Sequence, residues 1–137
     1  MGTNYFVTGV SHEDCDNSGR LHIGKSSGGW CFSLAVHNGL QSLAAWQELW
    51  SLPRVRIEDE YGRPVTPEEM TSRITERSWD RASSLDPEGY LALNRAEWLR
   101  QNSAVEGPNG LARHTYKARP PEGEPDATYD LVEGWFR

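Results

Sequence analysis

A glycine-rich segment between two apolar runs constrains the fold of this chain more than any other feature. It covers residues 21–32 and reads LHIGKSSGGWCF. Glycine allows sharp turns of the backbone, so we predict a β-hairpin whose tip lies at residues 25–29. From Trp30 to His37, large apolar residues alternate with small or polar ones, which is the period of a strand with one buried face.

Other segments rich in β-branched and aromatic residues predict further strands. They cover residues 4–10, 55–58 and 111–116. A last strand and an anchored C-terminus are predicted from Tyr129, Leu131 and Trp135. Residues 118–126 hold three prolines and three acidic residues. We therefore expect this segment to be an exposed loop.

Three helices are predicted from helical spacing and from capping residues. They cover residues 42–50, 66–77 and 90–101. Ser42 is the predicted N-cap of the first, and the second begins with the capping sequence Thr66-Pro67-Glu68-Glu69. The side chains expected to be buried in the second and third helices are Met70, Ile74, Leu91, Trp98 and Leu99.

The length and the order of these elements indicate the fold class. A chain of 137 residues is of the usual size for one domain, so we expect residues 1–137 to form a single domain. The predicted order is β-β-β-α-β-α-α-β-β. It indicates an α+β fold, with a mostly antiparallel sheet and about three helices packed on it.

Charge and hydropathy exclude some classes of function. The formal net charge of −6 argues against sequence-independent binding of nucleic acid, which depends on lysine and arginine. Six arginines between residues 54 and 81 are interpreted as a solvated face, and the alternative is a local basic patch. No apolar run approaches the roughly 20 residues of a membrane span, and no signal peptide is visible, so we expect a cytoplasmic protein.

The glycine-rich turn also has the composition of an anion site. Successive backbone N–H groups in such a turn can surround an anion, while Lys25 adds a positive charge and Ser26 and Ser27 add hydroxyl donors. The residues after Lys25 predict a strand, whereas a P-loop opens a helix, so nucleoside-triphosphate hydrolysis is not expected. The alternative is a simple glycine-rich turn with a solvated lysine.

A second interpretation of the same region is a metal site. His12-x-x-Cys15 has the spacing of adjacent zinc ligands, and His22 is a third candidate ligand, with Cys31 or His37 available to complete four. Zinc is the cofactor that this spacing implies. Two cysteines are too few for a disulfide scaffold.

Catalytic residues are not predicted. His22, His37 and His114 could serve in acid–base steps, and Ser26 or Cys31 could act as a nucleophile. No recognisable catalytic spacing connects them, so a small hydrolase is the least favoured interpretation.

Several stretches resemble a family of small, uncharacterised tailed-bacteriophage proteins. The central one is HIGKSSGGWCFSL at residues 22–34, and weaker ones are MGTNY at 1–5, GPNGL at 107–111 with Arg113-His114, and DLVEG at 130–134. Members of that family often carry Cys-x-x-Cys before the motif, where this chain has His12 to Cys15. The resemblance implies a phage origin and the host cytoplasm as the setting, and it implies no activity.

Together these observations lead to a hypothesis about function. We expect a phage protein that binds a small anionic, nucleotide-like ligand without turnover, and that counters host defence by sequestering an immune signal. The alternative is a zinc-stabilised module that binds a host protein or nucleic acid, and a homo-oligomer is compatible with either. The predicted ligand-binding residues are His22, Lys25, Ser26, Ser27, Trp30, Arg113 and His114. Among them, Trp30 is expected to be a stacking surface for the ligand.

Overall fold

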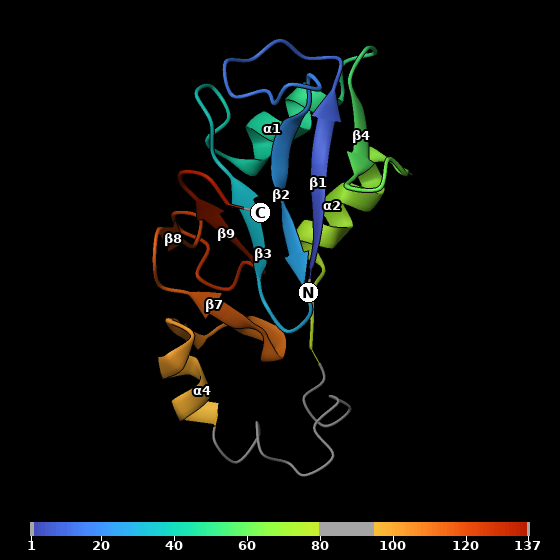
Figure 1. Ribbon diagram of the computed structural model, residues 1–137. Coiled ribbons are helices and arrows are strands. Elements are labelled where there is room, and N and C mark those ends of the chain that lie inside the picture. Colours follow the sequence, from blue (N-terminus) through green and yellow to red (C-terminus); the bar gives the residue numbers. More distant parts are fainter. Residues whose placement is uncertain (1, 80–94, 137) are drawn as a thin grey trace.

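A mixed sheet forms the centre of the protein, in a computed structural model that describes residues 2–79 and 95–136 (Figure 1). Within these residues, seven strands lie in the order β5-β4-β1-β2-β3-β9-β8. All neighbours are antiparallel except β3 and β9, which run parallel. The strands are β1 (Gly2–Thr8), β2 (Leu21–Ser27), β3 (Phe32–Ala35), β4 (Arg56–Asp59), β5 (Pro64–Val65), β8 (Ala118–Arg119) and β9 (Tyr129–Val132).

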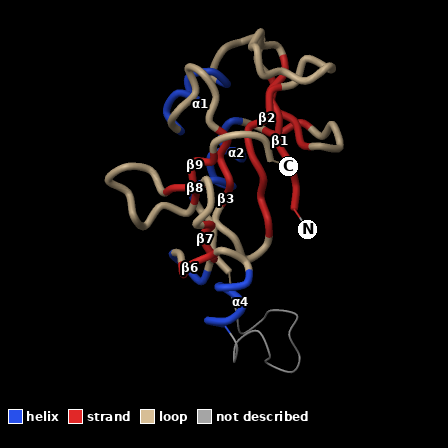
Figure 2. The backbone as a smooth tube through the Cα atoms, turned by 60° about the vertical axis from the view of Figure 1, so that its left-hand side comes forward, coloured by secondary structure: helices blue, strands red, loops and turns tan. Residues whose placement is uncertain are grey.

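A smaller unit lies at one end of this sheet, as both Figure 1 and Figure 2 show. It consists of α4 (Arg95–Gln101) and an antiparallel pair, β6 (Ala104–Glu106) and β7 (Ala112–His114). A 3₁₀ turn over Pro108–Gly110 connects the two strands. A single parallel bridge between Trp30 and Ala112 joins this unit to the segment that precedes β3.

Two helices cover one face of the large sheet, namely α1 (Leu43–Trp50) and α2 (Pro67–Thr75). Each begins with the predicted capping residue: the Ser42 hydroxyl accepts from the backbone N–H of Ala45, and that of Thr66 accepts from Glu69. The caps satisfy backbone donors that a helix leaves open at its first turn. The helices bury Trp46, Trp50, Met70 and Ile74 against apolar residues of the sheet.

The opposite face of the sheet carries no helix of the described residues. The C-terminal residues cross it instead, and in Figure 1 the C-terminus lies in front of the strands, with α1 and α2 behind them. Phe136 packs edge-on against the buried imidazole of His22, with ring centroids 4.8 Å apart. His22, Lys25 and Ser27 of β2 lie on this open face.

The α+β fold, the single domain and the mostly antiparallel sheet were predicted correctly. The third helix differs in part, because α4 packs mainly on β6 and not on the large sheet. Trp98 and Leu99 are half-buried on α4 instead of buried, and Leu91 lies outside the described residues. The burial of Met70 and Ile74 is confirmed.

Three local expectations are wrong. Strand β2 continues through Ser27, so the hairpin tip is Gly28 and Gly29 and not residues 25–29. Residues 118–126 are not all loop, because Ala118 and Arg119 pair with β9. Trp135 is 82% exposed and lies beyond β9, so it does not anchor the C-terminus.

No helix among the described residues is long and apolar enough to cross a membrane.

The central glycine of the motif is required by packing. A Cβ atom on Gly24 would lie 2.0 Å from the Ser33 carbonyl oxygen and 2.6 Å from Cε1 of Phe32, whereas one on Gly28 would meet only the Trp79 ring at 3.2 Å. We expect Gly24→Ala to lower the free energy of unfolding by about 1–3 kcal/mol, and Gly28→Ala by less. Urea denaturation of both variants measures this, and equal losses would contradict the packing argument.

Candidate functional site

Alternation along β2 divides the polar motif between the two faces of the sheet. Lys25 lies opposite Asn4 and Ser33 in the strand register, and Lys25 and Ser27 both line a cavity on the open face. Ser26 lies between them and is directed the other way, where its hydroxyl accepts a 2.6 Å hydrogen bond from Arg77. The two predicted hydroxyl donors therefore do not act together.

The cavity beside Lys25, called here the lysine cavity, has a volume of about 380 Å³. Its polar walls are an ammonium group, three hydroxyls, a thiol and an imidazole, and no carboxylate is among the residues that line it. Such a set donates hydrogen bonds and favours negative charge. The lining residues are Lys25, Ser27, Trp30, Cys31, Ser33, His114, Tyr116, Ala118, Val132 and Phe136.

The indole of Trp30 is already stacked within the protein. The His114 ring lies parallel to it, with centroids 4.0 Å apart and planes inclined by 11°, and Trp98 leans on it at 5.3 Å. The face of Trp30 expected to receive a ligand is thus covered by His114. Burial lowers the pKa of His114, and the charge of Lys25 lowers it further, so the imidazole is neutral at neutral pH.

Arg77 fixes the hairpin on the opposite side of the sheet. Besides Ser26, its guanidinium donates to the carbonyl oxygens of Ser27 at 2.8 Å and of Trp30 at 3.1 Å. Burial lowers the pKa of this guanidinium. Its interpretation as part of a solvated face is wrong, and no local pattern in the sequence signals the role because the bonds span about 50 residues.

Gly28 and Gly29 at the hairpin tip have a structural role in forming the turn. The backbone N–H of Trp30 donates to the Ser27 carbonyl at 3.1 Å, and Gly29 has a φ of +84°, which favours glycine. Trp79 packs across Gly28 and Gly29. The tip is therefore covered by an indole, which is a poor setting for the anion expected there.

The motif also satisfies the spacing of a P-loop, since residues 19–26 read GRLHIGKS. In a P-loop these residues wrap phosphates at the start of a helix. Here residues 21–27 form strand β2, and β3 follows the turn. The expectation that this is not a P-loop is confirmed by the secondary structure, although the spacing alone matches.

Arg113 has a structural role below the lysine cavity. Its Nε lies 2.7 Å from the carboxylate of Asp130, which is fully buried, and its two terminal nitrogens donate to the carbonyl oxygens of Pro125 and Ala127. The guanidinium therefore braces the loop before β9, and Arg113 does not line the cavity as predicted. Burial raises the pKa of Asp130 to about 6, against the opposing effects of Arg113 and the His114 backbone N–H.

The three candidate metal ligands are not brought together. His12 bonds to the Asn38 carbonyl oxygen and the Asp14 backbone N–H, while Cys15 packs against the apolar core. His22 is directed to the open face, where Nε2 lies 2.8 Å from the Asn4 side-chain oxygen. Among the described residues, no group of three or more histidine, cysteine or acidic side chains is arranged to hold a metal ion.

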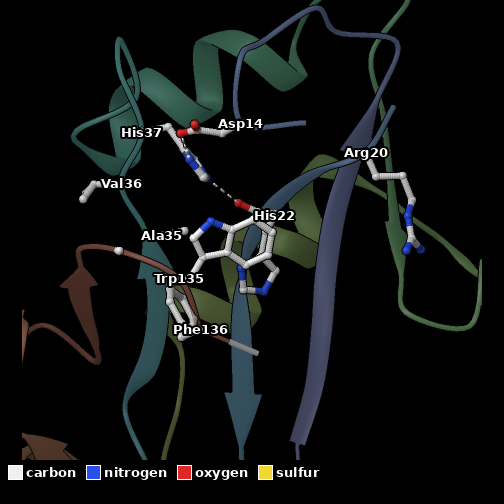
Figure 3. Close-up of a pocket in the computed structure, with 9 residues that line it drawn as sticks. Asp14, Arg20, His22, Ala35, Val36, His37, Trp135 and Phe136 are labelled. Atoms are coloured by element: carbon white, nitrogen blue, oxygen red, sulfur yellow. Dashed lines mark hydrogen bonds and ion pairs between the residues drawn. The ribbon is translucent and has the colours of Figure 1, made fainter. Parts of the chain in front are cut away.

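His22 instead lines a second cavity, called here the aromatic cavity, of about 220 Å³ (Figure 3). His37 closes its upper side: Nδ1 lies 2.8 Å from Asp14, and Nε2 lies 2.8 Å from the carbonyl oxygen of His22. Phe136 lines both cavities. Of the predicted ligand-binding residues, the lysine cavity thus gathers Lys25, Ser27, Trp30 and His114.

Comparison with known proteins adds no functional information: no family model, no curated protein and no solved structure matches the chain significantly.

The role of Arg77 predicts a large effect for a conservative change. Arg77→Gln removes charged hydrogen bonds to the hairpin, so we expect the free energy of unfolding to fall by at least about 2 kcal/mol. The exposed Arg54 provides a control, since Arg54→Gln is expected to change stability by less than about 0.5 kcal/mol. Urea denaturation followed by tryptophan fluorescence compares them, and a loss at Arg77 no larger than at Arg54 would contradict the role.

The buried carboxyl predicts a specific pH dependence. Because its folded pKa of about 6 lies above its ordinary value of 3.8, the folded protein binds a proton that the unfolded chain lacks between these values. This group therefore contributes stability that increases as pH falls from 7 to 4. We expect NMR titration of the Asp130 carboxyl to give a midpoint near pH 6. A midpoint below pH 4 would show that Arg113 lowers the pKa more than burial raises it.

Proposed function

We propose that this protein binds a small anionic ligand in the lysine cavity and does not turn it over. The observation that carries the proposal is the composition of that cavity: one ammonium group and several hydroxyls line it, together with no carboxylate. An ammonium group donates three hydrogen bonds and hydroxyls donate one each. A phosphate or carboxylate group accepts such bonds.

The electrostatics of His114 supports the same location for the anion. Lys25 lowers the pKa of His114, so the two groups act on one another across the cavity. A bound anion would offset the charge of Lys25 and favour the imidazolium form. Binding and protonation are therefore linked, and affinity is expected to increase as pH falls towards the pKa of His114.

The chemistry of the walls favours binding over covalent catalysis. Cys31 supplies the thiol in the wall of the cavity, and burial, followed by the charge of Asp130, raises its pKa. A protonated thiol is a poor nucleophile. His114, the imidazole of the cavity, is engaged in its stack with Trp30.

The ligand class and the setting are extensions of this proposal. A nucleotide-like ligand combines an anionic group with a ring, and the residue 22–34 motif resembles proteins of tailed phages. In the host cytoplasm, such a protein would sequester a nucleotide-like immune signal and thereby counter defence against the phage.

Calorimetric titration with inorganic phosphate and adenosine 5′-monophosphate (AMP) tests the site. Lys25→Ala removes the charged donor, so we expect affinity to fall about thirty-fold, which corresponds to roughly 2 kcal/mol. Arg54→Gln removes the same charge far from the cavity and is expected to leave affinity unchanged. Equal affinities of wild type and Lys25→Ala, or a larger effect at Arg54, would contradict the proposal.

A further inference from the structure

The two cavities of the open face are neighbours with one shared wall. Phe136 lines both, and its ring is held in place against the buried His22. A ligand whose anionic group lies beside Lys25 therefore has a second compartment next to it, on the far side of Phe136. The volumes differ, at about 380 Å³ for the lysine cavity and about 220 Å³ for the aromatic cavity.

The indole of Trp30 in the lysine cavity is already covered, because His114 stacks on it at 4.0 Å. Tyr116 of the same cavity is 73% exposed, and the ammonium group of Lys117 lies 5.5 Å from the centre of its ring. The aromatic cavity offers a larger exposed ring, because Trp135 on its rim is 82% exposed. Figure 3 shows the indole of Trp135 close to Phe136 and His22. A planar group entering there would meet an accessible π-surface.

A polar group at the same cavity can bind the edge of a heterocycle. Asp14 lines the cavity with Trp135 and binds His37 through one carboxylate oxygen. Its side chain is 47% exposed, so it can accept from an amino group. Arg20 also lines the cavity, but its guanidinium binds Asp16, lies over the ring of Phe6 and points away from Trp135 in Figure 3.

From these contacts we propose that the aromatic cavity is a ring-binding subsite for a nitrogen heterocycle. The ligand class is then a nucleoside phosphate, with its phosphate beside Lys25 and its base beside Trp135. Phe136 lies at the junction of the two groups. The subsite takes the stacking role that the sequence assigned to Trp30. This inference rests on the proposed function, because it needs the anion in the lysine cavity.

The test compares ligands with and without a base on the whole chain. Calorimetry gives the dissociation constants of ribose 5-phosphate and of AMP, which share the phosphate and sugar. Stacking and edge contacts are expected to make AMP bind at least tenfold more tightly. Trp135→Ala is expected to remove most of this advantage and to leave ribose 5-phosphate unchanged. Tyr61→Ala, at an aromatic residue 70% exposed and outside both cavities, is the matched control and should alter neither ligand.

The outcomes separate the two proposals. Equal affinities of AMP and ribose 5-phosphate, or an AMP advantage that survives Trp135→Ala, would overturn the ring subsite and leave the anion site standing. If ribose 5-phosphate does not bind at millimolar concentration, or binds Lys25→Ala as well as wild type, the proposed function fails and the subsite fails with it.

Discussion

One guanidinium group holds the hairpin on which the candidate site depends. Arg77 follows helix α2 and donates to the backbone or side chain of Ser26, Ser27 and Trp30. Lys25 and Trp30 lie at the two sides of the same turn, so fixing the turn also fixes two walls of the lysine cavity. The acceptors of this cation are carbonyl and hydroxyl oxygens, which satisfy it without placing a carboxylate near the proposed anion.

Strand geometry then assigns different roles to adjacent residues. Successive side chains of a strand point to opposite faces. Ser26 therefore binds Arg77 on the helix-covered face, while Lys25 and Ser27 line the lysine cavity on the open face. The C-terminal residues complete the open face, because Phe136 lies against His22 between the two cavities. The site is thus assembled from both ends of the chain.

Local patterns in the sequence were sufficient for much of the fold. Capping residues and helical spacing predicted α1 and α2, alternation predicted β3, and β-branched and aromatic residues predicted β1. These signals lie within a few residues of the structure they cause. Strand β8 was missed because two residues carry no periodicity, and its partner is distant in the sequence. The parallel pairing of β3 with β9 was not predicted either, because these two strands are also far apart in the sequence.

The sequence indicated the residue types of the candidate cavity better than it indicated their arrangement. Lys25, Ser27, Trp30 and His114 do meet, because strand pairing and the Trp30–Ala112 bridge bring them together. Arg113 was wrongly assigned to the ligand because it forms an ion pair with the buried carboxylate of Asp130. The role of Arg77 was missed because its hydrogen-bond acceptors lie about 50 residues away in the sequence. Neither partner is visible from spacing along the chain.

The central claim is that the anion lies in the lysine cavity and not at the glycine tip. Backbone NMR spectra recorded during titration with AMP locate the anion directly. The account predicts the largest shifts at Lys25, Ser27, Ser33 and His114, with small shifts at Gly28 and Gly29. Shifts confined to Gly28 and Gly29, or no shifts at all, would contradict it.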